Sequence, residues 1–420
     1  MRHLLLGLLS FTTACTGSIG DMGDDDQPPP STDVQIRVRD GNTPIAGASV
    51  IFQATDESVI AEVLTDANGT AIAEMPDGGN LTVIRSYPPP ATPEEEQRPT
   101  EVYTYVGVEA GDRLELGAQI DEEASPGAIN VKVPEEAQGT ITVTTPCGSG
   151  QGQAPLIPIT VRGCSNSLVV YVTDGDQGSF VKQMPYGELV DVSTEALLGR
   201  LSSSLTATNV TPGSDVRSEK RIEMGGFTLY SSGEKRIDTE PATIDLPQLT
   251  NVDELQVTRI TDSTGRTQMV GERKAYTKGT TVVDGSVGLI PYVGSPNYSP
   301  TGLSWVEQGP AQAQPNMVIA TLTVSRDLGG GIPGPNDVYV RAIVAPHAGS
   351  TLRMPMLPGA AAIFNPGATD EIAGALGLAQ VSGEYAAARP LVFTASSIIE
   401  AVPANGRVIL SYAGNNPPRI

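Results

Sequence analysis

Histidine, tryptophan and cysteine are scarce in this sequence: its 420 residues include two histidines, one tryptophan and three cysteines. The histidines are His3 and His347, so the chain holds neither an HExxH zinc motif nor the ligands of a multi-histidine metal centre. A Ser-His-Asp triad would have to use His347, and no GxSxG motif accompanies it. These absences disfavour zinc enzymes and serine hydrolases, and we expect His347 to be a loop residue without a catalytic role.

Aromatic residues, long apolar runs and positive charge are also in short supply. Phe, Trp and Tyr make up 5% of the chain, which disfavours a carbohydrate-binding platform because such platforms stack sugars on aromatic rings. No apolar run approaches the 18 residues of a membrane-spanning helix. The net charge is −22, and so acidic a surface repels phosphate backbones, which disfavours nucleic-acid binding.

A short apolar run opens the sequence. Residues 4–11 are mostly apolar, and the run gives way to small residues that end at Cys15. Its length is typical of a secretory signal and too short to span a bilayer. Ala14 and Cys15 resemble the lipobox of bacterial lipoproteins, in which the signal is removed just before a cysteine that carries a diacylglycerol; Thr12 stands where that pattern usually has an aliphatic residue. The resemblance implies a signal peptide over residues 1–14.

The same resemblance implies where the protein resides. A lipidated Cys15 would anchor the chain through its acyl chains. The residue after Cys15 is Thr16 and not Asp. In this respect the sequence is similar to lipoproteins that are sorted to the outer membrane, where the protein would lie on the periplasmic or the surface side. The alternative is an ordinary secretory signal cleaved near Ala14. Residues 15–32 are rich in Gly, Asp and Pro and predict a disordered acidic tether that holds a folded body clear of the membrane.

Two cysteines remain beyond the lipobox, Cys147 and Cys164. An exported compartment is oxidising, and an even number of cysteines favours pairing. If the chain folds back near Pro155, the two cysteines come to lie opposite each other. We expect a Cys147–Cys164 disulfide, with two free buried thiols as the alternative.

Glycine and proline are abundant, at 46 and 34 residues, and separate many short runs. In the first of these runs Val34, Ile36 and Val38 alternate with polar residues, as in a half-buried strand. We therefore expect an all-β chain of tandem β-sandwich domains. An N-terminal Ig-like or transthyretin-like sandwich would be followed by one or two further sandwich or jelly-roll-like domains.

Composition changes along the chain suggest the domain boundaries. The first domain is expected over residues 33–118 and is followed by a charged Pro-Gly linker over 119–127. A second β-rich domain is expected over 128–240 and a third over 241–420, although these two ranges could equally form one body. One short helix is expected over 194–204, because its leucines recur on one helical face.

Two segments of the first domain carry a family resemblance: "PIAGASV", which begins at Pro44, and "TDANGTA", which begins at Thr65. Together they resemble the carboxypeptidase regulatory-like domain, and they are similar to invasin-type bacterial Ig-like modules. The resemblance implies a small β-sandwich used as a spacer and interaction module. From the residues themselves we expect Asn68 and Gly69 to supply the positive φ angles of a tight hairpin turn, which Asp66 caps.

One acidic loop suggests a cation site. "TDGDQGS", residues 173–179, begins like a calcium loop with Asp174 and Asp176. The twelfth position of an EF-hand loop that starts at Asp174 would be Pro185 instead of Glu, so a hairpin turn is the main expectation. Asp174 and Asp176 stay as calcium candidates at a sandwich edge, and calcium is the sole cofactor that the sequence suggests.

Two other patterns are better explained by structure than by chemistry. Ser232 and Lys235 have the Ser-x-x-Lys spacing of penicillin-interacting enzymes, but the partner motifs are missing and the segment has the composition of a turn. Trp305, Tyr292 and Tyr298 would line a small site if they met, whereas core packing is the commoner role of such residues.

Together these observations predict a non-catalytic, lipid-anchored envelope protein that acts as a spacer and as a protein-interaction or adhesion module. Its expected partners are the membrane, reached through the N-terminal lipid, and an envelope or extracellular protein or glycan. One alternative is a surface hydrolase or an accessory subunit for polysaccharide or peptide breakdown, whose carboxylates the sequence does not locate. Another is a ligand-binding component of an envelope assembly.

Overall fold

The computed structural model describes most of the chain beyond residue 31. The described residues are 32–41, 43–87, 98–117, 127–162, 167–175, 178–224, 227–237, 241–285, 289–309, 312–326, 337–393, 398–399, 402–413 and 417–418. The expected signal peptide, the lipidated Cys15 and all of the tether except Thr32 therefore lie outside the described residues. No helix among the described residues is long and apolar enough to cross a membrane.

One long sheet organises the fold. In the described residues it has thirteen strands, and β19 (Lys235–Ile237) joins it by pairing with β17. From one edge to the other the remaining strands are β18 (Phe227–Ser231), β17 (Asp215–Met224), β21 (Asp253–Thr261), β22 (Thr267–Ala275), β30 (Arg407–Tyr412), β29 (Glu371–Val381), β26 (Met317–Ser325), β27 (Val338–Pro346), β7 (Thr100–Val108), β6 (Gly79–Arg85), β3 (Ser49–Gln53) and β4 (Val59–Leu64).

Three smaller sheets pack on successive stretches of this long sheet. Near β4 lies the first, with β1 (Asp33–Asp40), β2 (Thr43–Pro44), β5 (Thr70–Glu74) and β8 (Arg113–Leu116). The second has β24 (Tyr292–Ser299), β25 (Gly302–Gln308) and β28 (Thr351–Arg353), and the third has β16 (Arg200–Thr208), β20 (Ala242–Pro247) and β23 (Thr281–Asp284). Each pair of layers encloses its own cluster of buried apolar side chains.

The first sandwich shows why the alternating segment forms a strand. Val34, Ile36 and Val38 of β1 are fully buried and pack in one cluster with Phe52 of β3 and Leu81 of β6. Burial of one face of β1 drives this packing, since each apolar side chain of this size gains about 1.5–3 kcal/mol on leaving water. The predicted alternation in this segment is confirmed.

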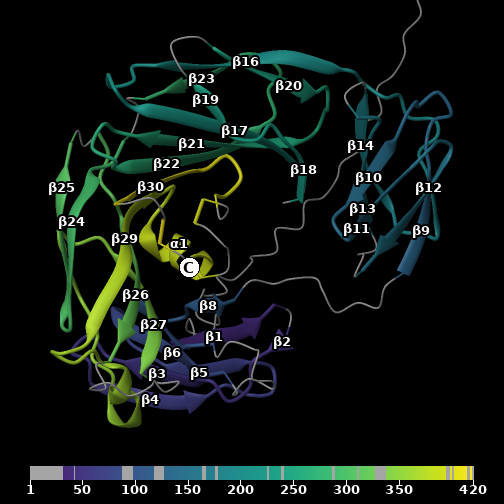
Figure 1. Ribbon diagram of the computed structural model, residues 1–420. Helices are drawn as coiled ribbons and strands as arrows, with labels where there is room; N and C mark the ends of the chain where they lie inside the picture. The colour runs from purple at the N-terminus through teal and green to yellow at the C-terminus, as the bar shows by residue number, and fades with distance from the viewer. Residues whose placement is uncertain are drawn as a thin grey trace, which may run out of the picture. The chain divides into compact units, whose positions relative to one another are not determined.

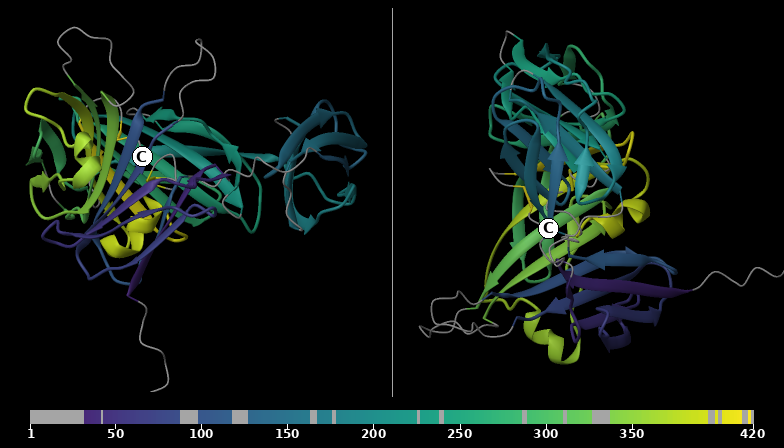
Figure 2. Two further views of the ribbon diagram at one scale, coloured as in Figure 1. Left: turned by 90° about the horizontal axis from the view of Figure 1, so that it is seen from below. Right: turned by 90° about the vertical axis from the view of Figure 1, so that its right-hand side faces the viewer.

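The N-terminal and C-terminal parts of the chain share that sheet and that core. Strand β7 pairs in parallel with β27, with Thr100 opposite Tyr339. The apolar cluster of the first sandwich also includes Phe393, whose ring meets those of Tyr103 and Tyr105 edge to face at 5.2 and 4.9 Å. Figures 1 and 2 show the junction, where the blue ribbon of the N-terminal strands gives way to the green of β27. Strands expected in the first and third domains thus form one continuous sheet.

A further sheet has seven strands. Its strands, in order, are β14 (Ser179–Pro185), β13 (Ser167–Thr173), β10 (Ile141–Thr145), β11 (Gly148–Gly152), β12 (Leu156–Val161), β9 (Gly127–Lys132) and β15 (Leu189–Asp191). Buried apolar residues of β9, β10, β12 and β15, and those on one face of β13, belong to one cluster, so the sheet curls around a core.

The helix expected over residues 194–204 is wrong. The chain there makes a bridge between Ser179 and Leu198 and then forms β16, which pairs antiparallel with β20 and parallel with β23. Three successive serines, residues 202–204, favour helix poorly, and the backbone pairing on both sides decides the outcome. Leu205 is buried between the sheets, whereas Leu201 is exposed, so the leucines do not share a face.

Helical structure is confined to short pieces in the described residues. These are η2 (Gly359–Phe364), α1 (Tyr385–Ala388) and η3 (Arg389–Leu391). Strands account for nearly all the other regular structure, and the sheets pack face to face as described above. The predicted all-β class with β-sandwich architecture is confirmed.

Candidate functional site

The segment "TDANGT" forms an arch between two sheets instead of a hairpin within one. It links the end of β4, in the long sheet, to the start of β5, in the small sheet. Asp66 Oδ1 accepts hydrogen bonds of 2.8 Å from the backbone N–H groups of Asn68 and Thr70. Gly69 has a φ of +72°, and an added Cβ would come 2.3 Å from Val38 O. Asn68 is not among the residues with positive φ, so the expected two-residue turn is wrong.

The arch gives Asp66 a pH-dependent role in stability. The Thr70 N–H, followed by that of Asn68, lowers the pKa of Asp66 in spite of its partial desolvation. A carboxyl whose pKa is lower in the folded state stabilises the fold above its unfolded pKa of about 3.9, and loses that effect as pH falls through the folded value. We expect Asp66→Asn to be less stable than the wild type at pH 7 and to match it near pH 2 in urea unfolding. The exposed Glu115→Gln serves as control, and an unchanged gap at both pH values would contradict the prediction.

The calcium and disulfide candidates are described only in part. Asp174 follows β13, and its Oδ1 is buried without a hydrogen-bond partner among the described residues; Asp176 lies outside them. No cluster of three or more His, Cys, Asp or Glu side chains suited to a metal ion occurs in the described part of the chain. Cys164 lies outside it as well. Arg162, two residues before Cys164 in the sequence, donates its backbone N–H to Cys147 O at 2.7 Å, so the end of β12 lies beside Cys147. The Cys147–Cys164 disulfide stays a prediction.

His347 and Trp305 meet at a carboxylate. Glu307 Oε1 lies 2.8 Å from His347 Nε2, and it accepts hydrogen bonds from Trp305 Nε1 at 3.2 Å and from Ser350 Oγ at 3.4 Å. The serine hydroxyl thus contacts the carboxylate and not the imidazole, which is not the order of a nucleophilic triad. The contacts join the loop after β27 to strand β25 and hold Trp305 in the core.

The tyrosines near Trp305 each have their own partner. Tyr298 donates its hydroxyl to Gly374 O at 2.9 Å. The guanidinium of Arg266 lies over the ring of Tyr292, 5.2 Å from its centroid. Burial raises the pKa of both tyrosines. These contacts favour packing over a shared binding site for Trp305, Tyr292 and Tyr298.

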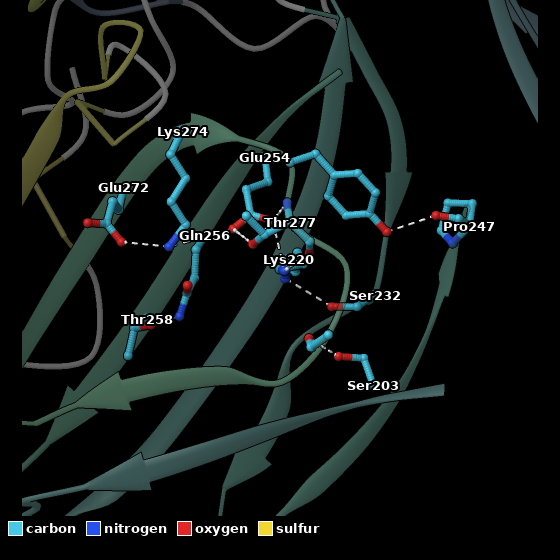
Figure 3. A network of polar contacts seen from close by, with 12 residues as sticks. Ser203, Lys220, Ser232, Pro247, Glu254, Gln256, Thr258, Glu272, Lys274 and Thr277 are labelled. Carbon is cyan, nitrogen blue, oxygen red and sulfur yellow. Dashed lines mark hydrogen bonds and ion pairs between the residues drawn. The ribbon is translucent and has the colours of Figure 1, made fainter. Parts of the chain in front are cut away.

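Ser232 takes part in a buried polar network instead of pairing with Lys235. Its Oγ accepts a hydrogen bond of 2.9 Å from the backbone N–H of Lys220, and Lys235 lies exposed on β19. The side chains of Lys220 and Glu254 point toward each other from the neighbouring strands β17 and β21 (Figure 3), and both are fully buried. Their Nζ and Oε2 atoms are 2.8 Å apart. Lys274, at the protein surface, lies 3.6 Å from Glu254 Oε1.

The remaining polar atoms of this pair are satisfied locally. The N–H of Thr277 donates to Glu254 Oε2 at 3.1 Å, and Lys220 Nζ donates to Thr277 O at 3.3 Å. The ring of Tyr276 lies 5.6 Å from Lys220 Nζ. A buried ion pair persists only with such additional hydrogen bonds, because both charges have lost their water. The network therefore holds strands β17 and β21 to the segment that follows β22.

A pocket of about 190 Å³ with both polar and apolar lining residues adjoins the network. Gln256, Thr258 and Glu272 of the long sheet line it, together with Asp284 of β23 and Arg407 of β30. Glu272 Oε2 accepts a hydrogen bond from Lys274 Nζ at 3.2 Å. None of the described residues that line the pocket is a serine, cysteine or histidine.

The first sandwich exposes two neighbouring strand edges. Among the described residues, β4 pairs with β3 alone and β5 pairs with β1 alone, and the arch places both edges on the same side. Apolar side chains project from them into solvent: Val59 is 47% exposed, Ile60 39%, Leu64 64% and Ile72 49%. We call these two strands the open edge.

A shallow groove of about 800 Å³ lies at one end of the open edge, where β4 begins and β5 ends. Four alanines line it, Ala54, Ala61, Ala73 and Ala110, together with the larger apolar side chains of Ile60, Met75 and Pro76. The charged side chains at the groove and on the two strands are Glu62, Glu74 and Asp77, and neither set includes a Lys or Arg. The open edge is therefore apolar with an acidic rim.

Comparisons with known proteins leave the family open. No protein-family model matches the chain, and neither does any of the curated proteins compared with it. Among solved structures, the Bacillus anthracis TIE protein is 13% identical over 60% of this chain and 50% of its own, with a TM-score of 0.15. The native conformation of E. coli alpha-2-macroglobulin is 10% identical over 89% of this chain and 27% of its own, with a TM-score of 0.12. Similarity this low carries no argument about function.

Proposed function

We propose that the protein is a non-catalytic, lipid-anchored module of the bacterial outer membrane, which holds β-sandwiches beyond the membrane and binds another protein. The observation that carries this proposal is the open edge. A free strand edge with exposed apolar side chains is a liability that natural proteins usually cover with charge, proline or another element. Contiguous exposed apolar surface is typical of an interaction site.

The placement at the membrane depends on sequence features. The apolar run that ends at Cys15 resembles a lipoprotein signal, and the acidic residues that follow are typical of a solvated tether. The same charge disfavours nucleic acid as the partner. A module on such a tether reaches partners of the envelope or the extracellular space.

Photo-crosslinking in living cells tests both parts of the proposal. We expect a photoreactive amino acid at Leu64, on the open edge, to yield discrete crosslinked products, whereas the same residue at Val306, which is also exposed but lies on β25, should yield none. The products should depend on Cys15, because Cys15→Ala removes the anchor and releases the protein from the membrane fraction. Equal labelling from Leu64 and Val306, or no crosslinks from Leu64, would contradict the interaction role. Membrane retention of Cys15→Ala would contradict the anchor.

A further inference from the structure

The geometry of the open edge points to one mode of binding. We infer that the open edge receives an extended, basic segment of a partner protein, which adds as a strand beside β4. This inference rests on the proposed interaction function and names the partner's chemistry. Strand addition supplies affinity through backbone hydrogen bonds, and pockets for alternate side chains supply specificity.

The backbone of β4 meets the first requirement. Its Val59–Leu64 span pairs with β3 on one side, and no described strand pairs with the other. Six residues extend about 20 Å at roughly 3.3 Å per residue, which is an ordinary strand length. A peptide of about six residues is therefore long enough to pair with the whole of β4.

The side chains meet the second requirement. Ala61 and Ala73 face the core from β4 and β5, and their small size leaves the groove between the two sheets open. Leu64 alternates with Val63 on β4 and points to solvent, whereas Ile60, at a shift in the register between β3 and β4, is exposed beside the groove that it lines. An added strand would place every second side chain over the groove and the others beside Ile60 and Leu64. Apolar residues are favoured on both faces.

Charge distinguishes the partner from segments of this chain. The rim carries Glu62, Glu74 and Asp77 without a Lys or Arg. A second copy would bring the same acidic rim, and residues 15–31 would bring four aspartates and no basic residue. Like charges placed face to face oppose either occupant. Lysine or arginine beside the apolar residues of a partner strand would be complementary instead.

A selection from random peptides tests the inference on the full chain. The probe is a phage-displayed library of 12-residue peptides. We expect the enriched peptides to alternate apolar residues and to carry net positive charge. Ala61→Arg and Val59→Arg, which place a bulky cation at the groove and at the β4 edge, should each weaken binding of the best synthetic peptide at least tenfold. Val306→Arg, at an exposed site on another sheet, is the matched control and should leave binding unchanged.

Backbone pairing is tested on the peptide itself. N-methylation at alternate positions of the best peptide removes the N–H groups of one edge, and methylation of the intervening positions removes those of the other. If a strand adds to β4, one pattern should weaken binding at least tenfold and the other much less. Equal effects, acidic or non-alternating enriched peptides, or a lack of enrichment would overturn the inference.

The outcomes separate this inference from the proposed function. If Leu64 gives crosslinks in cells but Ala61→Arg leaves peptide binding unchanged, strand addition would be overturned and the interaction role would stand. Absence of those crosslinks would overturn the role itself. A concentration-dependent dimer that Ala61→Arg abolishes would assign the open edge to a second copy, which also overturns a basic partner. Because Ala61 is half-buried, a loss of binding in Ala61→Arg alone does not distinguish a folding defect from a blocked groove. Val59→Arg changes an exposed residue and makes that distinction.

Discussion

Glu254→Gln is expected to lower the free energy of unfolding by about 3–5 kcal/mol, because it leaves the fully buried ammonium of Lys220 without its carboxylate. Thr277 O and the ring of Tyr276 remain as its contacts, and neither carries a charge that would compensate. Urea unfolding of the purified chain, followed by circular dichroism, measures the loss.

Further variants show whether the loss comes from the unpaired charge. Lys220→Met should cost less than Glu254→Gln, because Lys274 still lies 3.6 Å from Glu254. The double variant Lys220→Met/Glu254→Leu should recover much of the stability, since a buried pair replaced by apolar residues is often neutral. Lys132→Met, which breaks an exposed pair with Asp191, is the control and should cost under about 1 kcal/mol. A Glu254→Gln loss no larger than the control would contradict the prediction.

Phe393→Ala is expected to destabilise the protein by about 3–5 kcal/mol, the range for removing a large buried aromatic side chain. The ring is buried in the cluster of the first sandwich and meets Tyr103 and Tyr105 of β7 edge to face. Since β7 also pairs with β27, the loss should affect both ends of the chain in one unfolding transition. Hydrogen exchange of β1 and β29 amides in the variant and the wild type measures this coupling.

The neighbouring Leu391→Ala provides the matched control, since that side chain is 44% exposed. It should change stability by less than about 1 kcal/mol. Increased exchange confined to the C-terminal strands in Phe393→Ala would contradict a shared core. It would instead favour the separate domains that the composition suggested for residues 33–118 and 241–420.

The sequence predicted the class of structure more reliably than its connections. Alternation at Val34, Ile36 and Val38 reports burial of one face, a local property of a strand, and the structure confirms it. The arch after β4 was expected to be a hairpin, because Asp66 and Gly69 dictate a tight turn without specifying which sheet the next strand joins. The helix predicted over residues 194–204 is wrong for a related reason. The pairing of β16 with β20 and β23 outweighs the helical spacing of its leucines.

The candidate site was less predictable still. Nothing local distinguishes Lys220 and Glu254 from other charged residues of amphipathic strands, and their burial depends on the sheet that covers them. The sequence does not predict the open edge either, because the exposure of Ile60 and Leu64 depends on the position of β4 in the sheet. In the part of the chain that the structure describes, β4 has a single strand neighbour; this is a property of topology, which pattern and composition do not encode.

The parallel pairing of β7 with β27 also bears on how the molecule reaches its folded state during synthesis. A chain that is synthesised amino end first presents β7 more than two hundred residues before β27, the strand that pairs with it. Pairings of such long sequence separation form slowly. Until the carboxyl half is made, one edge of β7 lacks the strand that pairs with it in the folded protein, and an unpaired edge is a template for wrong pairing.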